Sequence, residues 1–106
     1  MDEQKFKERT KKLALRVVQL VEELPRSPAA DVISRQLLRS ATSIGANYRA
    51  ACRGKSKADV ISKLSIVEEE ADESVYWLEL LLDLRFLILD FDPAFNPKSA
   101  IQNLKL

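Results

Sequence analysis

The sequence predicts a single all-α domain over residues 1–106, an up-down four-helix bundle with long second and third helices and a short or truncated fourth. Apolar residues recur at spacings of three and four over most of the chain, which is typical of amphipathic helices. Two glycines and four prolines in 106 residues leave little room for a hairpin-rich β fold. The abundance of Leu, Ala, Glu, Lys and Arg also favours helices, and the length suits one domain.

The first helix is expected from about Glu3 to Leu24. Its apolar residues form one stripe, which consists of Phe6, Leu13, Val17, Leu20 and Leu24. Pro25 ends this helix because the residue before a proline is pushed out of the α region. Ser27 and Pro28 predict the start of a second helix, since serine is a favoured N-cap and proline fits the first helical position.

The second helix, expected from about Pro28 to Arg53, has an apolar side and a basic side. A rotation of about 100° per residue places on the apolar side Ile33, Leu37, Ile44, Tyr48 and Ala51. Four arginines cluster on the opposite side: Arg35, Arg39, Arg49 and Arg53. Small residues run between the two sides, and among them Gly45 costs about 1 kcal/mol relative to alanine inside a helix. The expected compensation is the close approach of another backbone.

The third helix is expected from about Lys57 to Leu89. Gly54 stands at the C′ position of the preceding helix, and Ser56 with Asp59 resembles a capping box. The spacing of apolar residues predicts a core stripe made of Val60, Ile61, Leu64, Ala71, Val75, Leu78, Leu82, Phe86 and Leu89.

Two features of this third helix depart from a simple amphipathic pattern. Glu68 lies near the core stripe, so we expect it either to reach water or to be ionised and paired with a partner on the second helix. The candidate partners are Arg39, Arg49 and Tyr48. A second apolar face covers the last three turns and consists of Trp77, Leu80, Leu81, Leu84, Leu87 and Ile88. A helix that is apolar nearly all round must be covered on both sides.

The end of the chain offers little to cover this second face. Asn96 and Pro97 predict the start of a fourth helix, on which Ile101 and Leu104 are apolar. About ten residues cannot shield a helix about three times as long. We therefore expect either that the natural chain continues beyond Leu106 or that other subunits bury the face. The second reading predicts a homo-oligomer with an interface formed by Trp77, Leu80, Leu81, Leu84 and Ile88.

The charged residues are segregated along the chain. Residues 1–63 hold 14 Lys/Arg and 7 Asp/Glu, whereas residues 64–106 hold 3 Lys/Arg and 9 Asp/Glu, so the formal net charge of +1 divides into +7 and −6. Such asymmetry indicates either a basic surface for nucleic acid or helices that neutralise each other within or between subunits.

The composition argues against an enzyme, a metal site or a cofactor site. The chain has no histidine and one cysteine, which excludes di-iron Glu-x-x-His pairs, imidazole zinc sites, Ser-His nucleophiles and an internal disulfide. Neither a Gly-x-Gly-x-x-Gly loop nor a Walker loop is present. No apolar run reaches membrane-spanning length, so we expect a cytoplasmic protein with no membrane partner.

Several short blocks occur in an order that resembles the four-helix-bundle family of bacterial 23S ribosomal RNA intervening-sequence proteins. These blocks are SATSIGAN at 40–47, GKSKAD at 54–59, KLSI at 63–66, EADE at 70–73 and YWLELL at 76–81. The resemblance implies an up-down four-helix bundle and a ring of five subunits. It also implies a relation to accessory proteins of diversity-generating retroelements, which bind nucleic acid and a reverse transcriptase through a basic surface. The short fourth helix departs from the family, in which the last helix is full length.

Two functional classes follow from these observations. The first is a non-enzymatic oligomeric module that binds RNA or DNA, chiefly through phosphates, with little sequence preference. Its candidate nucleic-acid-binding residues are Arg35, Arg39, Arg49, Arg53, Lys55 and Lys57. The second is a protein-only assembly or adaptor module, in which the same arginines pair with the acidic start of the third helix of a neighbour.

Overall fold

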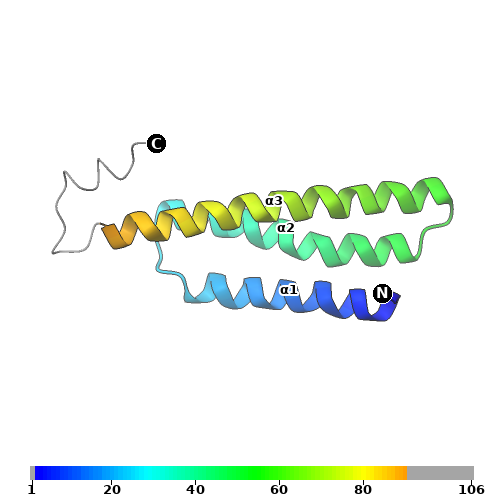
Figure 1. Ribbon diagram of the computed structural model, residues 1–106, viewed down its shortest axis with the longest axis horizontal. Helices are drawn as coiled ribbons and strands as arrows, with labels where there is room; N and C mark the ends of the chain where they lie inside the picture. The colour runs from blue at the N-terminus through cyan, green and yellow to red at the C-terminus, as the bar shows by residue number, and fades with distance from the viewer. Residues whose placement is uncertain (1, 91–106) are drawn as a thin grey trace.

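The computed structural model describes the backbone of residues 2–90 and the side chains of residues 2–84 (Figure 1). Within this part of the chain there are three helices and no strand: α1 (Glu3–Glu23), α2 (Pro28–Cys52) and α3 (Lys57–Asp90). The all-α prediction is therefore confirmed, with the helix boundaries within one residue of those expected. The predicted fourth helix lies outside the described residues, so the four-helix bundle stays a prediction.

Each helix begins with the cap that its sequence predicts or allows. Asp2 caps α1 by accepting a hydrogen bond from the backbone N–H of Lys5 at 2.7 Å. Ser27 caps α2 by accepting from the N–H of Ala30 at 3.1 Å. At the start of α3, Ser56 Oγ accepts from the N–H of Asp59 at 3.0 Å. Such bonds satisfy backbone donors that have no partner inside the helix.

The capping box before α3 forms with one change in its hydrogen bonds. Its return bond, from a backbone N–H to the Asp59 carboxylate, comes from Lys55 at 3.3 Å rather than from Ser56. Gly54 directly follows the C-cap residue Arg53, so it stands at the predicted C′ position. It lacks the left-handed conformation typical of that position, because no glycine among the described residues has a positive φ. A Cβ on Gly54 would collide with the Val60 side chain and lie 3.1 Å from the Ala51 carbonyl oxygen. Glycine is needed here for close packing of the turn onto α3.

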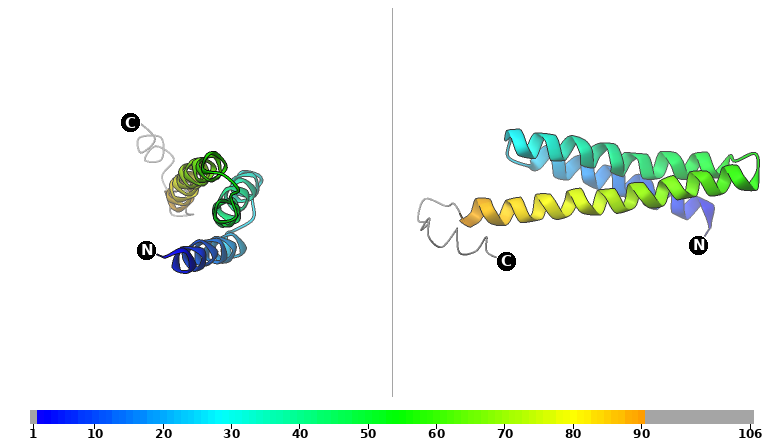
Figure 2. Two further views of the ribbon diagram at one scale, coloured as in Figure 1. Left: turned by 90° about the vertical axis from the view of Figure 1, so that its right-hand side faces the viewer. Right: turned by 90° about the horizontal axis from the view of Figure 1, so that it is seen from above.

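The α2 helix packs against both other helices, and consecutive helices run antiparallel (Figures 1 and 2). The buried core joins all three helices and consists of Val17, Leu37, Ala41 and Leu81. Leu37, on the predicted apolar side of α2, and Ala41, one of the small residues between its two sides, have no exposed surface. No helix within the described residues is both long and apolar enough to cross a membrane.

Close contact between α1 and α2 occurs where the sequence predicts it. A Cβ added to Gly45 would lie 3.2 Å from Thr10 Oγ1 and 3.7 Å from the Thr10 carbonyl carbon. Thr10 is itself buried, and its hydroxyl donates to the Lys7 carbonyl oxygen at 3.0 Å. The predicted close approach at Gly45 is therefore confirmed, and it sets the spacing of the two helices.

The predicted core stripe of α3 is wrong at four of its nine positions. Four of its members are between 43% and 55% exposed: Ile61, Leu64, Val75 and Leu82. Val60, Ala71 and Leu78 are half-buried, and the side chains of Phe86 and Leu89 lie outside the described residues. The helix instead turns Ser74 and Leu81 toward α2, where the Ser74 and Ser40 hydroxyls form a buried hydrogen bond of 2.8 Å. Because serine is small, Ser40 and Ser74 allow the backbones of α2 and α3 to approach each other. The prediction considered only the spacing of apolar residues, so it did not include these serines.

Candidate nucleic-acid interface

The outer face of α2 carries the predicted arginines, and all four are exposed: Arg35, Arg39, Arg49 and Arg53. Lys55 and Lys57, on the connection to α3 and at the start of α3, are also exposed. The outward orientation of these six residues agrees with the sequence-based expectation. Their surroundings differ, however, and divide the predicted stripe into four parts.

Arg39 is neutralised within its own chain. Its guanidinium contacts the Glu70 carboxylate at 3.1 Å and also pairs with the Glu73 carboxylate. Glu73 in addition accepts a hydrogen bond of 2.9 Å from the indole N–H of Trp77. The segregation of charge predicts pairs either within or between subunits, and this one lies between α2 and α3 of one chain. Arg39 is therefore the least available of the four arginines.

The expected pairing of Glu68 is wrong, because Glu68 is exposed. The same rotation of α3 that buries Ser74 carries Glu68 away from α2. Glu70 and Glu73 take its place opposite Arg39. The structure confirms the alternative expectation, in which Glu68 is in contact with water.

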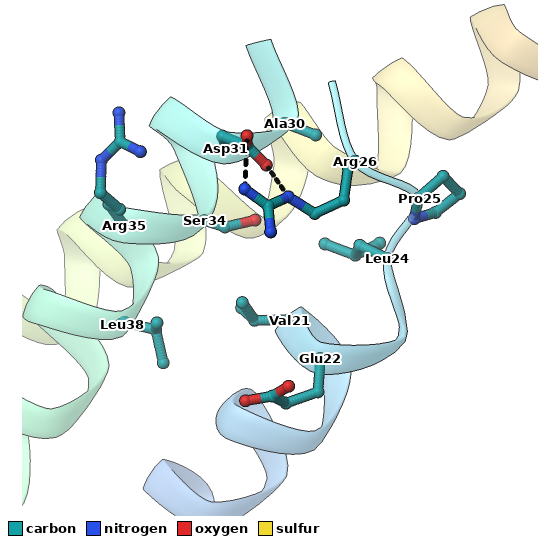
Figure 3. A pocket seen from close by; sticks show the side chains of 10 residues that line it. All are labelled: Val21, Glu22, Leu24, Pro25, Arg26, Ala30, Asp31, Ser34, Arg35 and Leu38. Carbon is teal, nitrogen blue, oxygen red and sulfur yellow. Dashed lines mark hydrogen bonds and ion pairs between the residues drawn. The ribbon is translucent and has the colours of Figure 1, made fainter. Parts of the chain in front are cut away.

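Arg35 lies beside a groove of mixed charge where α1 turns into α2 (Figure 3). The groove has a volume of about 340 Å³, and its lining includes Glu22, Asp31 and Arg26. Arg26 makes a two-pronged pair with Asp31, with N–O distances of 3.1 and 3.2 Å. Figure 3 shows the Arg35 guanidinium directed away from this pair. Two carboxylates nearby make this end of α2 a poor place for an anion.

Arg49 lies beside a different groove, also between α1 and α2, with a volume of about 360 Å³. It is lined by Lys7, Thr10, Lys11, Ala14, Thr42, Gly45, Ala46 and Arg49. Three of these side chains are cationic and none is a carboxylate. Lys7 and Lys11 were not among the predicted site residues. Their signal was present in the sequence, because lysines four residues apart share one face of a helix and Gly45 marked where that helix approaches α2.

Arg53, Lys55 and Lys57 extend the basic surface around the α2–α3 connection. None of these three side chains forms an ion pair within residues 2–84. Exposed cations without a paired carboxylate keep most of their attraction for an anionic partner. The described basic surface therefore runs from the groove at Arg49 to the start of α3.

A small polar cluster sits where the N-terminal end of α1 meets the C-terminal end of α2. The Phe6 and Tyr48 rings pack edge to face with centroids 4.4 Å apart. Hydrogen bonds from Lys7 and then from the Cys52 thiol lower the pKa of Glu3. Desolvation, followed by the hydrogen bond with Cys52, raises the pKa of Tyr48. Tyr48 packs against Phe6, so it does not interleave the basic surface as a stacking platform for bases.

The residues of the predicted oligomer interface lie in different surroundings within one chain. Trp77 and Leu81 belong to the core within one chain, against Leu37 and Ala41 of α2. Leu80 and Leu84 are half-buried, and the side chain of Ile88 lies outside the described residues. Over residues 57–84, the large apolar residues that α3 leaves exposed are Ile61, Leu64, Val75, Tyr76 and Leu82.

Comparisons with known proteins agree with this helical architecture. A family model described as 23S rRNA-intervening sequence protein matches residues 2–92. A crystal structure of a protein of unknown function from the S23 ribosomal protein family of Bacteroides thetaiotaomicron VPI-5482 superimposes with a TM-score of 0.72 at 36% sequence identity. The match covers 96% of this chain and 84% of that one. No curated protein matches the chain. Neither matching description mentions a retroelement or a reverse transcriptase, so both stay predictions.

Proposed function

Because the chain belongs to the family of 23S rRNA-intervening sequence proteins, we propose that it is a non-enzymatic homo-oligomer that binds nucleic acid through the basic surface of α1 and α2. The observation that carries the proposal is the row of exposed cations that no carboxylate pairs within the described residues. This row consists of Lys11, Arg49, Arg53, Lys55 and Lys57.

The chemistry of this surface favours contacts to phosphates rather than to bases. Lysine and arginine bind phosphate oxygens whatever the base sequence, and such contacts release counterions from the nucleic acid. The surface has no exposed aromatic side chain among its cations, so little stacking on bases is expected. Binding should therefore be strongly dependent on salt and weakly dependent on sequence.

The exposed apolar face of α3 supports the oligomeric part of the proposal. Leu64, Val75 and Leu82 lie on one side of α3 and are 43%, 51% and 55% exposed. An exposed apolar patch of this kind is typical of a protein–protein contact. Repetition of the basic surface around an oligomer multiplies the phosphate contacts that one chain supplies, and so raises avidity. A ring of five, as the family resemblance implies, would have a mass of about 60 kDa from five chains of 12.0 kDa.

Fluorescence anisotropy with labelled RNA and DNA of mixed sequence tests the proposal. We expect the native protein to bind both, with an affinity that falls linearly on a log–log scale between about 50 and 200 mM salt. Changing Arg49, Arg53, Lys55 and Lys57 together to alanine should abolish most of this binding. The control is Arg39→Ala, which removes an arginine that is already paired with Glu70 and Glu73.

The competing function is a protein-only assembly or adaptor module. The pairing of Arg39 with two glutamates of α3 favours it, because it shows that basic and acidic helices of this chain are complementary. This reading expects no binding of RNA or DNA by the native protein even at about 50 mM salt. Equal affinity of the native protein and the four-site variant would also contradict binding through this surface.

A further inference from the structure

The groove around Arg49 differs from the rest of the basic surface because cationic residues of two helices line it. Lys7 and Lys11 line it from α1, and Arg49 lines it from α2. The similar groove at the other end of these helices has Glu22 and Asp31 in its lining. Two grooves of nearly equal volume, about 360 and 340 Å³, therefore differ in charge: one is cationic and the other is mixed.

Small residues make the cationic groove concave. Ala14, Gly45 and Ala46 have small side chains, so they leave space in the groove beside the longer side chains of Lys7, Lys11 and Arg49. The contact of Thr10 with Gly45 keeps α1 and α2 close, which brings the cations of one helix near those of the other. Because the residues that line the groove lie on helices, its shape does not depend on a mobile loop.

The charges in this groove are available to a ligand. Lys11 and Arg49 form no ion pair within the described residues. Lys7 pairs with Glu3 at 3.0 Å. The two residues are four positions apart on the surface of α1, and the Glu3 side chain is 58% exposed. Exposed pairs of this kind contribute little free energy, so Lys7 can exchange Glu3 for a more highly charged partner.

From these observations we infer that the α1–α2 groove seats the phosphodiester backbone of a bound nucleic acid, with Lys11 and Arg49 as the main contacts. This inference rests on the proposed function and names the place on the basic surface where binding is strongest. The planar guanidinium of Arg49 can bind two phosphate oxygens at once, whereas the ammonium groups act as point charges. A strand that lies in the groove then continues toward Arg53 and the α2–α3 connection, since both lie at the same end of α2.

A pair of charge-matched double variants tests the groove. The first, Lys11→Ala with Arg49→Ala, removes one cation from each wall of the groove. The second, Lys12→Ala with Arg35→Ala, removes one exposed cation from each of the same helices outside the groove. With labelled single-stranded RNA or DNA, the first should lower the salt slope by about 1.4, or about 0.7 for each lost phosphate contact. The second should leave the slope nearly unchanged.

A second pair of variants tests the shape of the groove without changing its charge. Ala46→Phe fills the groove, and Val32→Phe places the same ring on the exposed face of α2 outside it. We expect a clear loss of affinity for the first and none for the second, with both proteins equally helical by circular dichroism. Competition by inorganic phosphate at matched ionic strength should be weak, because a single phosphate lacks the further contacts of a strand.

The results separate this inference from the proposed function. If the native protein binds nucleic acid but the two double variants weaken it equally, the charge acts over the whole surface and the groove is not a site. If polyglutamate competes as well as RNA at equal charge, the groove recognises any polyanion and the assignment to a phosphodiester strand is wrong. If the native protein binds no nucleic acid at all, the proposed function fails and this inference fails with it.

Discussion

Thr10 of α1 and Gly45 of α2 lie so close that a Cβ on Gly45 would be 3.2 Å from Thr10 Oγ1. Thr10 is buried, and it cannot move outward without opening the contact between the two helices. This single contact explains a glycine in the middle of a long helix, and it also determines the depth of the cationic groove beside it.

Replacing Gly45 with valine should therefore destabilise the fold. Overpacking of a tight contact typically costs about 1–3 kcal/mol, and we expect a loss of this size in the free energy of unfolding measured with urea. The matched control is Ala46→Val at the neighbouring exposed position, which should cost only the difference in helix propensity, a few tenths to about 0.7 kcal/mol. Equal losses in the two variants would show that the approach of Thr10 does not constrain position 45.

Replacing Arg39 with alanine should have a small effect on stability. The Arg39 side chain is 49% exposed, so its pairs with Glu70 and Glu73 are screened by water and are expected to contribute about 0.2–1 kcal/mol in total. The environment of Trp77 should change as well, because its indole N–H donates to the same Glu73 carboxylate. Urea unfolding followed by Trp77 fluorescence measures both effects. A loss of several kcal/mol would contradict this view of an exposed, screened pair.

Charges placed on the exposed face of α3 should dissociate the proposed oligomer. Val75→Glu with Leu82→Glu introduces two carboxylates at positions that are 51% and 55% exposed in a single chain. We expect light scattering to show a monomer of about 12 kDa with unchanged helix content, because burying two unpaired carboxylates in an interface is unfavourable. The control is Val32→Glu on α2, where valine is also 51% exposed. An unchanged mass for the α3 variant would mean that this face is not the subunit contact.

Tyr48 should titrate above its ordinary pKa of 10.0, chiefly because of desolvation and next because of its hydrogen bond with Cys52. As the pH rises above 10, Tyr48 loses its proton in the unfolded state before it does so in the folded state, because its pKa is higher in the folded state. The free energy of unfolding therefore falls. Its contribution to stability is thus fully present below pH 10 and disappears as the pH rises through the raised folded pKa.

Ultraviolet absorbance of the Tyr76→Phe variant measures this titration, since Tyr48 is then the only tyrosine. Adding Cys52→Ala should move the pKa of Tyr48 part of the way back toward 10.0, because it removes the causes that involve Cys52 and leaves desolvation in place. A pKa that does not respond to Cys52→Ala would show that the thiol is not a partner of Tyr48.

Local features of the fold were predictable from the sequence because their causes lie within a few residues. Ser27 and Ser56 cap helices that begin where predicted, and both cap bonds form to a backbone N–H three residues later. The inner side of α2 was equally predictable, since Leu37, Ile44 and Ala51 are buried as their spacing indicates. The outward direction of the arginines on α2 follows from the same periodicity.

The rotation of α3 was not predictable from spacing, because both of its sides carry apolar residues and the choice depends on its partner. Ser74 faces α2 since Ser40 offers it a hydrogen bond and both side chains are small. Arg39 then holds Glu70 and Glu73 at the edge of the same contact.

The cationic groove likewise needs two helices. Lys11 and Arg49 are 38 positions apart, and no local pattern in the chain joins them. They line one groove because Gly45 allows α1 to pack closely against α2. Spacing along one helix gives the direction of a side chain relative to its own axis, whereas the neighbours of that side chain follow from how the helices pack.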